Sequence, residues 1–238
     1  MNEMLTQTAA PITLRVGSYN IRHGADVGLD MSILAADLRA LDLDLVGLQE
    51  VDICTSRVGG LDTLSLLADA AGYGHRAFAK SMDYRGGEYG TAILSRYPIV
   101  DFRVLPLPMT EGLEPRAVGV ATLLIGERRV TFCNTHLSVE TAEAREAQFA
   151  YLGELLASED FFVLTGDFNT TELGGFERIA GERFVNRGQY PTFAPTGSPI
   201  DNIVYGAAWR LLDAGMKSSE GHSDHNLLWA EIFEILQN

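Results

Sequence analysis

The apolar stretch FFVLTGDFNT, residues 161–170, ends in a carboxylate and an amide two positions apart, Asp167 and Asn169. Successive side chains of a β-strand point to opposite faces, so residues two apart project in the same direction. If the extended conformation persists past Gly166, these two side chains stand next to each other, which suits catalysis at a strand end. Asp, Asn and Thr also favour turns and helix N-caps. For this stretch alone, both interpretations are open.

Six more polar residues stand where apolar, strand-like segments meet loops. They are Asn20, Glu50, His136, Asp201, Asp224 and His225. Each has a structural explanation by itself, since a single His at a strand end is more often a hydrogen-bonded structural residue than a catalyst. With Asp167 and Asn169 they form a set of carboxylates, amides and imidazoles, in which Asp201 is available to orient another group. Strand–loop junctions are the usual place for chemistry on a rigid scaffold.

This set of side chains predicts a particular chemistry. Oxygen-rich ligands with few sulfur atoms suit a hard cation such as Mg²⁺ or Mn²⁺ more than zinc. Imidazoles beside such ligands supply proton transfer or hydrogen bonds to an oxyanion. The combination favours hydrolysis of a phosphate ester, in which a metal neutralises developing charge and a base or carboxylate directs water.

The elements that carry these residues are visible in the hydrophobic pattern. Apolar residues at helical spacing predict helices over 31–41, 61–71 and 140–157, with a short helix near 171–180. Strand-like segments, bounded by Gly, Pro and charged turns, are 12–21, 43–50, 75–82, 89–95, 100–107, 117–125, 128–137, 161–170, 200–205, 209–215 and 227–233. Such a mixture predicts sheets packed face to face and covered by helices on the outside.

The chain reads as one domain. No repeat, low-complexity tract or charged linker divides its 238 residues. We expect residues 1–11 to be a flexible N-terminal extension and residues 12–238 to form the domain. The most economical expectation for the oligomeric state is a monomer.

The charge of the chain limits its partners. It has 18 basic and 32 acidic residues, a net charge of −14. This balance works against a broad, sequence-independent grip on nucleic acid, which depends on many Lys and Arg contacts to phosphates, although a local basic patch remains compatible with it. Most of the acidic residues are expected on the solvated surface.

Few features of the sequence indicate the cellular compartment of the protein. The two cysteines, Cys54 and Cys133, are far apart in sequence and do not indicate a disulfide framework. The N-terminal MNEMLTQTAAP lacks the basic and apolar regions of a signal peptide, and no apolar run approaches membrane-spanning length. The sequence therefore predicts a cytoplasmic protein without a membrane span.

Seven motifs occur in the order found in one known superfamily: SYNIRHG, LQEVD, GEYGTAILSRYPI, NTHLS, LTGDFN, IDNIVY and GHSDHN. Together they span residues 18–226 and resemble the endonuclease/exonuclease/phosphatase, or DNase-I-like, hydrolases. The resemblance is to the compact bacterial branch. It implies an α/β fold, a four-layered sandwich in which two central, mainly antiparallel sheets are flanked by helices, with the active site where strand ends converge.

The resemblance also implies a metal site. Carried over onto this sequence, Glu50 of LQE is similar to the principal ligand of Mg²⁺ or Mn²⁺. Asn20 and Asp224 resemble the residues that assist it.

The remaining residues resemble the groups that act on the phosphate. Asp167 and Asn169 are similar to the pair that positions the attacking water and the scissile phosphate. His225, paired with Asp201, resembles the general base or the group that stabilises the phosphorane-like charge, and His136 resembles a phosphate donor or general acid. Whether His225 or Asp167 is the base stays open. Arg116 could contact the substrate phosphate in a bidentate manner, or be a surface charge at a strand edge.

Other positions fit the family less directly. Glu88 could orient His136 or be an exposed turn carboxylate, and Arg145 and Gln148 match a family pattern for which we expect a structural role. Arg22 stands where abasic-site endonucleases of the superfamily carry an acidic residue. This departure argues against their metal arrangement and a role in DNA repair.

Three functions are compatible with the sequence. The first is a Mg²⁺- or Mn²⁺-dependent phosphoesterase, acting on a phosphodiester or phosphomonoester of a small or lipid-derived molecule. The second is a nuclease acting on DNA or RNA, which the net charge disfavours, and the third is a catalytically silent binding module. Specificity is expected to depend on four loops, at residues 57–61, 81–87, 109–114 and 189–199.

Overall fold

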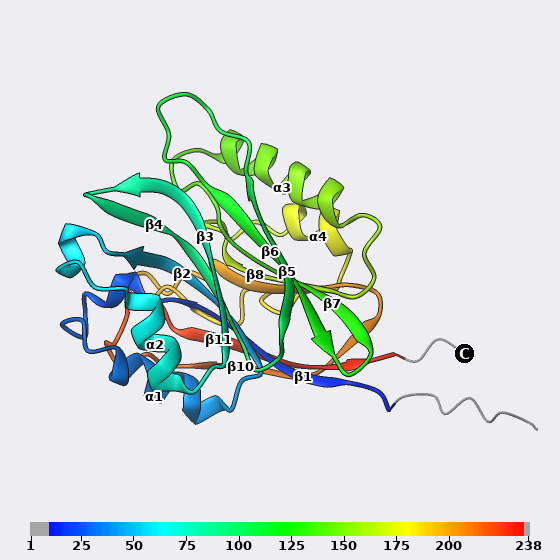
Figure 1. The fold of residues 1–238 in the computed structure, drawn as a ribbon. Helices are drawn as coiled ribbons and strands as arrows, with labels where there is room; N and C mark the ends of the chain where they lie inside the picture. Colours follow the sequence, from blue (N-terminus) through cyan, green and yellow to red (C-terminus); the bar gives the residue numbers. More distant parts are fainter. Residues whose placement is uncertain (1–9, 236–238) are drawn as a thin grey trace, which may run out of the picture.

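Two β-sheets pack face to face between two pairs of helices (Figure 1). The structure is a computed structural model that describes residues 10–235. Most of the predicted flexible extension, residues 1–9, lies outside the described residues. The four layers agree with the sandwich predicted from the sequence.

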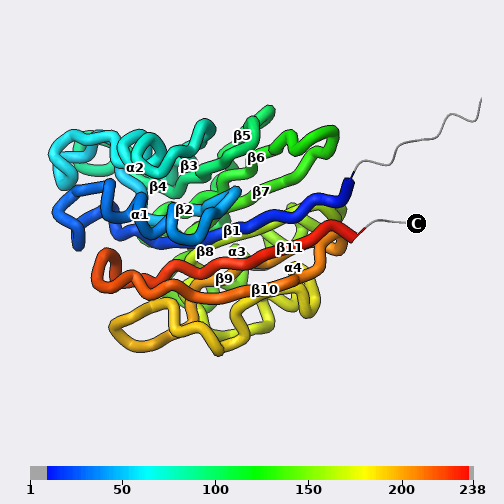
Figure 2. The backbone as a smooth tube through the Cα atoms, turned by 90° about the horizontal axis from the view of Figure 1, so that it is seen from below, coloured from blue at the N-terminus to red at the C-terminus, as the bar shows by residue number. Residues whose placement is uncertain are grey.

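The first sheet has six strands in the order β10-β11-β1-β2-β4-β3. They are β1 (Thr13–Asn20), β2 (Leu45–Ile53), β3 (His75–Tyr84), β4 (Gly87–Ser95), β10 (Trp209–Lys217) and β11 (Leu227–Glu234). Only the β1–β2 pair is parallel; the other neighbours are antiparallel. Figure 2 shows β1 beside β11, the first and last strands of the chain.

The second sheet has five strands in the order β5-β6-β7-β8-β9. They are β5 (Ile99–Pro106), β6 (Ala117–Ile125), β7 (Arg128–His136), β8 (Phe162–Asp167) and β9 (Asp201–Tyr205). Here the parallel pair is β7–β8. Each sheet thus contains one parallel pair, and the two pairs pack against each other across the interface between the sheets.

The helices are α1 (Met31–Leu41), α2 (Thr63–Ala71), α3 (Ala142–Leu156) and α4 (Gly174–Ala180), with short 3₁₀ turns η1 (Arg22–Gly24) and η2 (Ser56–Val58). Side chains cap three of them: Asp30 accepts from Ser32, Asp62 from Ser65 and Thr141 from Ala144. The crossovers α1 and α3 connect the parallel strand pairs, because parallel neighbours need a long connection. None of the described helices is long and apolar enough to cross a membrane.

Three apolar layers hold these elements together. The inner faces of the two sheets share one cluster, with Leu14, Phe132 and Ile232 fully buried. A second cluster lies under α1 and α2, and a third under α3 and α4. Each fully buried side chain of this size contributes about 1.5–3 kcal/mol of transfer free energy, which makes the layered burial the main source of stability.

One buried polar network interrupts the apolar layer between the sheets. Asn134 on β7 donates to the carbonyls of Leu48 and Ala92 in the opposite sheet, at 2.8 and 2.9 Å. Its Oδ1 accepts from Gln49 at 2.7 Å and from Thr165 at 3.0 Å. These bonds fix the lateral position of one sheet on the other close to the carboxyl ends of the parallel strands, where the predicted site residues lie.

Gly47 on β2 leaves the space that this network occupies. A methyl group at Gly47 would overlap Thr165 Oγ1 and Asn134 Oδ1. We therefore expect Gly47→Ala to lower the free energy of unfolding by about 3 kcal/mol, through overpacking and broken buried hydrogen bonds. Urea unfolding followed by circular dichroism measures the change.

The matched control is Gly153→Ala in the last turn of α3, where the nearest atom to an added Cβ is 3.9 Å away. Alanine there should raise stability by about 0.5–1 kcal/mol, because the unfolded chain loses conformational freedom. Equal effects of the two substitutions would contradict the role given to the network.

Candidate active site

The parallel strand pairs bring the predicted site residues to one edge of the sandwich. β1 ends at Asn20, β7 at His136 and β8 at Asp167. His136 is paired directly with Asp167 in the β7–β8 register. Because the carboxyl ends of parallel strands meet at the same edge, residues far apart in sequence become neighbours there.

A cleft of about 440 Å³ opens at this edge. Seven of the nine predicted site residues line it: Glu50, Arg116, His136, Asp167, Asn169, Asp224 and His225. The other two, Asn20 and Asp201, are fully buried and form hydrogen bonds with the lining residues Glu50 and His225. The structure therefore gathers the whole predicted set in one place.

Asp167 lies at the centre of this set and is itself buried. Its Oδ2 atom is 3.5 Å from Nε2 of both His136 and His225, and it accepts from the side-chain amide of Asn20 at 3.2 Å. Its Oδ1 atom accepts from the backbone N–H of Asn169 at 3.0 Å. Two imidazoles from different parts of the chain thus converge on one carboxylate oxygen.

Of the two interpretations of residues 167–169 left open by the sequence, the structure shows the turn, and the predicted strand 161–170 ends early. β8 ends at Asp167, and Asn169 has a left-handed backbone with φ +51°. The Asp167 side chain bonds the N–H two residues on, which is an Asx turn, and the Asn169 amide donates to Leu137 O at 3.0 Å. The turn and the site coincide, because the turn itself brings Asn169 to the cleft.

His225 and Asp201 form a buried ion pair. Nδ1 of His225 lies 2.8 Å from Oδ2 of Asp201, whose side chain is 1% exposed. Burial alone would lower the pKa of His225, but Asp201, Asp167 and Asp224 raise it to about 10. The imidazole is therefore cationic at neutral pH. Burial, and then repulsion by Asp201, raises the pKa of Asp167 above its usual range.

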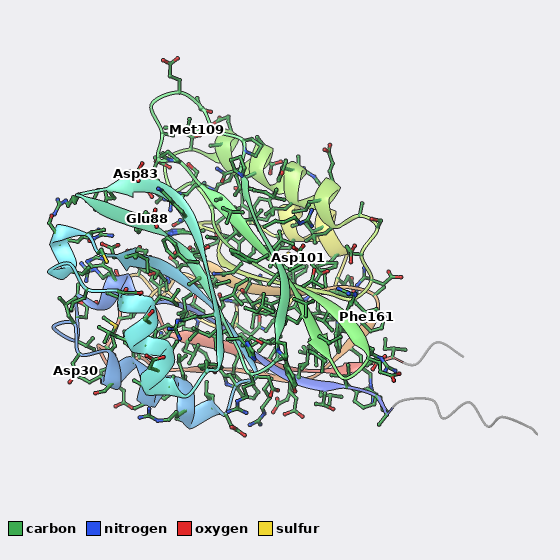
Figure 3. All side chains as sticks on the ribbon, in the orientation of Figure 1. Asp30, Asp83, Glu88, Asp101, Met109 and Phe161 are labelled. Atoms are coloured by element: carbon green, nitrogen blue, oxygen red, sulfur yellow. The ribbon has the colours of Figure 1, made fainter. Side chains whose placement is uncertain are left out.

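His136 is in a different electrostatic environment. Burial, followed by the positive charge of Arg116, lowers its pKa to about 3, so its imidazole is neutral at neutral pH. Within residues 10–235, its Nδ1 has no hydrogen-bond partner. Glu88, the candidate orienting group, instead bonds Lys80 at 2.8 Å on the β3–β4 hairpin (Figure 3). The two histidines thus differ in charge, and they also differ in that Asp201 binds Nδ1 of His225 whereas Nδ1 of His136 has no partner among the described residues.

Glu50 reaches the cleft through an irregularity of β2. The β2–β4 register shifts between Leu48 and Val51, and Glu50 has φ +55°. Such a bulge redirects a side chain out of the strand and is frequent beside active sites. Burial would raise the pKa of Glu50, but His23, His136 and Asn20 bring it to about 2. The carboxylate is therefore ionised where it meets the cleft.

The oxygen donors of Glu50 and Asp224 fit a hard divalent cation better than any sulfur-seeking metal. Asn20 donates its amide to Glu50 at 3.1 Å and to Asp167, so in this arrangement it orients the carboxylates. Ligation through its oxygen would require the amide to turn over. Among the described residues, one acid–histidine trio has ligand atoms within 4.8 Å of each other, Asp167, Asp201 and His225. The hydrogen bond between the last two already explains their proximity.

The loop that carries Asp224 and His225 is anchored from several sides. Ser223 Oγ donates to the carbonyl of Asn20 at 2.7 Å. On α1, the buried carboxylate of Asp37 binds Lys217 Nζ at 2.6 Å and His222 Nδ1 at 2.9 Å. The sequence does not predict this role of Asp37, because a single acidic residue in an amphipathic helix is typical of a solvated face.

Arg145 and Gln148 on α3 support the segment that follows His136. Gln148 Oε1 accepts from the N–H of Ser138 at 2.9 Å, and Arg145 donates to the Ser138 carbonyl at 3.1 Å. Neither lines the cleft. Arg22 lies at the edge of the site, with Nε 3.6 Å from Asp224 Oδ2.

Comparison with known proteins identifies the relatives of this fold. The profile of the Endonuclease/Exonuclease/phosphatase family matches residues 17–225. The chain is similar to the solved structure of a protein of that family from Bacteroides thetaiotaomicron, with 21% identity and a TM-score of 0.74 over 96% of this chain and 100% of that one.

Two further structures are similar. The mannosyl-6-phosphatase of Bacteroides thetaiotaomicron VPI-5482 has 20% identity and a TM-score of 0.68, over 92% of this chain and 99% of that one. TDP2 from Caenorhabditis elegans has 19% identity and a TM-score of 0.70, over 93% and 74%. No curated protein sequence matches the chain. At these identities the likeness shows the fold, and it confirms the predicted DNase-I-like sandwich.

Asp37→Asn tests the anchor of the loop that carries Asp224 and His225. It should lower the free energy of unfolding by about 1–3 kcal/mol, because Lys217 loses its charged partner in a partly buried position. Backbone amides of residues 219–226 should also exchange faster with deuterated water than in the wild type.

Asp69→Asn is the control, since Asp69 pairs with Arg76 on the surface and its side chain is 71% exposed. This change should alter stability by less than about 0.5 kcal/mol. Unchanged exchange of residues 219–226 in Asp37→Asn would show that the loop does not depend on this anchor.

Proposed function

Because the chain belongs to the endonuclease/exonuclease/phosphatase family, whose members hydrolyse phosphoesters, we propose that it is a Mg²⁺- or Mn²⁺-dependent hydrolase acting on a small or lipid-derived phosphoester. The observation that carries the proposal is the convergence of two imidazoles on one buried carboxylate, with both histidine Nε2 atoms 3.5 Å from Asp167 Oδ2. The structural likeness to a mannosyl-6-phosphatase supports a small substrate.

Arg116 is the proposed contact for the substrate phosphate. Its guanidinium lines the cleft with only 5% of the side chain exposed. Nε has no hydrogen-bond partner in the described part of the chain, and the only ionic contact of the group is with Glu114 at 3.1 Å. Buried donors without partners are costly, and a phosphate oxygen in the cleft would satisfy them with charge-assisted bonds.

The protein groups around the phosphate have distinct roles in this proposal. Asp167 accepts a proton from the attacking water, since its raised pKa makes it a better base than an ordinary carboxylate. His225, cationic and held by Asp201, donates a hydrogen bond to a phosphoryl oxygen as negative charge develops. Neutral His136 and the amide of Asn169 hold the other side of the phosphate.

Glu50 and Asp224 would hold the metal, with Asn20 beside them. Bound there, a divalent cation would neutralise charge on the phosphoryl oxygens. The low pKa of Glu50 keeps its carboxylate ionised over the whole neutral range, which favours metal binding.

The nuclease alternative has less support. The two arginines of the cleft, Arg57 and Arg116, are already paired with Asp52 and Glu114. Nucleic acid needs several cations free to meet successive phosphates, and the net charge of −14 adds repulsion. A small phosphoester needs only the contacts at the catalytic end of the cleft.

Metal-dependent turnover is the direct test. Purified protein should hydrolyse members of a panel of phosphomonoesters and phosphodiesters when Mg²⁺ or Mn²⁺ is added, and chelator should abolish the reaction. His225→Ala should lower kcat by about 10²–10⁴-fold, the usual contribution of a positioned acid–base group. Asp201→Asn should also lower kcat, because the imidazole loses its anionic partner.

The control for these variants is His75→Ala on β3, because His75 lies outside the cleft. It should retain the wild-type rate. Turnover that resists chelator, or that survives His225→Ala, would refute the proposal. Cleavage restricted to oligonucleotides, falling steeply with salt, would establish the nuclease alternative.

Metal binding itself has a readout independent of turnover. At a free metal concentration of 100 times Kd, the native state should gain about 2.7 kcal/mol of stability, which raises the melting temperature. Glu50→Gln should remove most of this gain. Glu88→Gln is the matched control, because Glu88 bonds Lys80 on the hairpin and should leave the gain intact. Equal gains in stability in both variants would show that Glu50 is not a metal ligand. No gain in stability in the wild type would favour the catalytically silent binding module.

A further inference from the structure

Several residues that line the cleft have no part in the catalytic roles. Four of them are Arg57, Tyr84, Tyr89 and Glu114, which we call the distal wall. The two tyrosines stand at the β3–β4 hairpin, directly after Asp83 and Glu88, which Figure 3 labels. Glu114 precedes β6, on the segment that follows Met109. Three of the four residues belong to the loops predicted to set specificity.

The distal wall is held rigid by a buried ion pair. Arg57 donates from Nε and Nη2 to the two carboxylate oxygens of Asp52, at 2.8 and 2.7 Å, and the side chain of Asp52 is fully buried. The same guanidinium lies 4.7 Å from the ring centroid of Tyr84 and 5.3 Å from that of Tyr89. Bidentate pairing and cation–π contact fix all three groups. A preorganised wall of this kind binds a ligand at low entropic cost.

The two tyrosine rings form a corner rather than a flat stack. Their centroids are 6.1 Å apart and their planes are inclined by 53°. Tyr89 is almost buried, whereas Tyr84 is half-buried. The corner therefore offers aromatic surface to a ligand of ring size.

Polar atoms of the distal wall lack partners. Among the described residues, the hydroxyls of Tyr84 and Tyr89 make no hydrogen bond, and the Glu114 carboxylate makes its ionic contact with Arg116 Nη1 through Oε1, at 3.1 Å, which leaves Oε2 available. A ligand with hydroxyl groups would satisfy these atoms, as donor to Glu114 and as donor or acceptor to the tyrosines. An alkyl chain at the same place would cover these polar atoms without pairing them, which is costly.

Charge excludes another class of ligand. Arg57 is matched by Asp52, and Arg116 by Glu114, so the distal wall has no net positive charge. Arg85 lies 5.3 Å from the Tyr84 ring centroid but does not line the cleft, so a second phosphate bound against Glu114 would meet no unmatched cation among the residues of the distal wall. The wall thus suits an uncharged group.

We propose that the distal wall binds the organic group esterified to the phosphate, and that this group is an uncharged ring bearing hydroxyl groups. The inference rests on the proposed phosphoester hydrolysis and names its substrate class. Stacking on the tyrosine corner and hydrogen bonds to Glu114 select the ring, while the catalytic end of the cleft holds the phosphate. A sugar phosphate and a nucleoside monophosphate share this chemistry.

Relative kcat/KM values test the proposal. The substrates are a hexose 6-phosphate, a nucleoside 5′-monophosphate, n-hexyl phosphate and a hexose 1,6-bisphosphate, each also as its methyl diester, with p-nitrophenyl phosphate as a general substrate. At least one hydroxylated monophosphate or its diester should exceed the alkyl and bisphosphate counterparts by about tenfold or more, because sites built to bond hydroxyls reject analogues that lack them. Comparison of kcat/KM between the hexose phosphate and the nucleoside monophosphate identifies which ring is preferred.

Two variants locate the preference on the distal wall. Tyr84→Phe removes one hydroxyl, and Glu114→Gln removes the carboxylate; the first is the cleaner change, because Glu114 also pairs with Arg116. Each should reduce the ratio of kcat/KM for the preferred substrate over n-hexyl phosphate by about five- to tenfold. The matched controls Tyr151→Phe on α3 and Glu111→Gln on the same loop as Glu114 should leave that ratio unchanged, because neither lines the cleft.

The two possible failures are distinguishable. Metal-dependent turnover of p-nitrophenyl phosphate without any preference for hydroxylated substrates, or with a preference that survives both variants, would overturn the distal-wall proposal and leave phosphoester hydrolysis standing. Failure of the wild type to turn over any phosphoester would overturn both.

Discussion

The architecture of the site depends on two carboxylates, Asp167 and Asp201, that are buried beside one imidazolium, His225. This cation offsets the cost of burying the two carboxylates, because an unpaired buried charge is strongly destabilising. The three residues come from β8, from β9 and from the loop before β11, so the balance is reached only when both sheets are in place. The same electrostatic requirement therefore links the fold to the chemistry.

The parallel strand pairs make this convergence possible. In two mainly antiparallel sheets, the pairs β1–β2 and β7–β8 are the exceptions, and their carboxyl ends supply Asn20, His136 and Asp167 at one edge. The polar network around Asn134 fixes the sheets on each other just behind that edge. The residues that line the cleft there include the charged groups that suit a phosphate and the two tyrosines of the distal wall.

The sequence predicts what is encoded locally. Helix 31–41 has the predicted bounds because its apolar spacing is a local signal and its cap, Asp30, directly precedes it. Asp167 is recognisable because a polar residue closing an apolar strand is also a local signal. Features that depend on the partner strand are not predictable in this way. The bulge that turns Glu50 into the cleft is a register shift against β4, and the Asn169 side chain is held by the bond that it donates to Leu137 O, directly after β7. Tyr89 on the distal wall carries no sequence signal, because a tyrosine in a strand is equally typical of a core.

The charge states of the histidines test this account most directly. The chain has five histidines, so selective ¹⁵N labelling resolves the imidazole signals of His136 and His225 in the native protein. We predict that His225 stays protonated at both nitrogens from pH 5 until the pH approaches about 10, while His136 stays neutral throughout. Titration of both side chains near the ordinary histidine pKa, about 6.5, would contradict the buried ion cluster at the centre of the site.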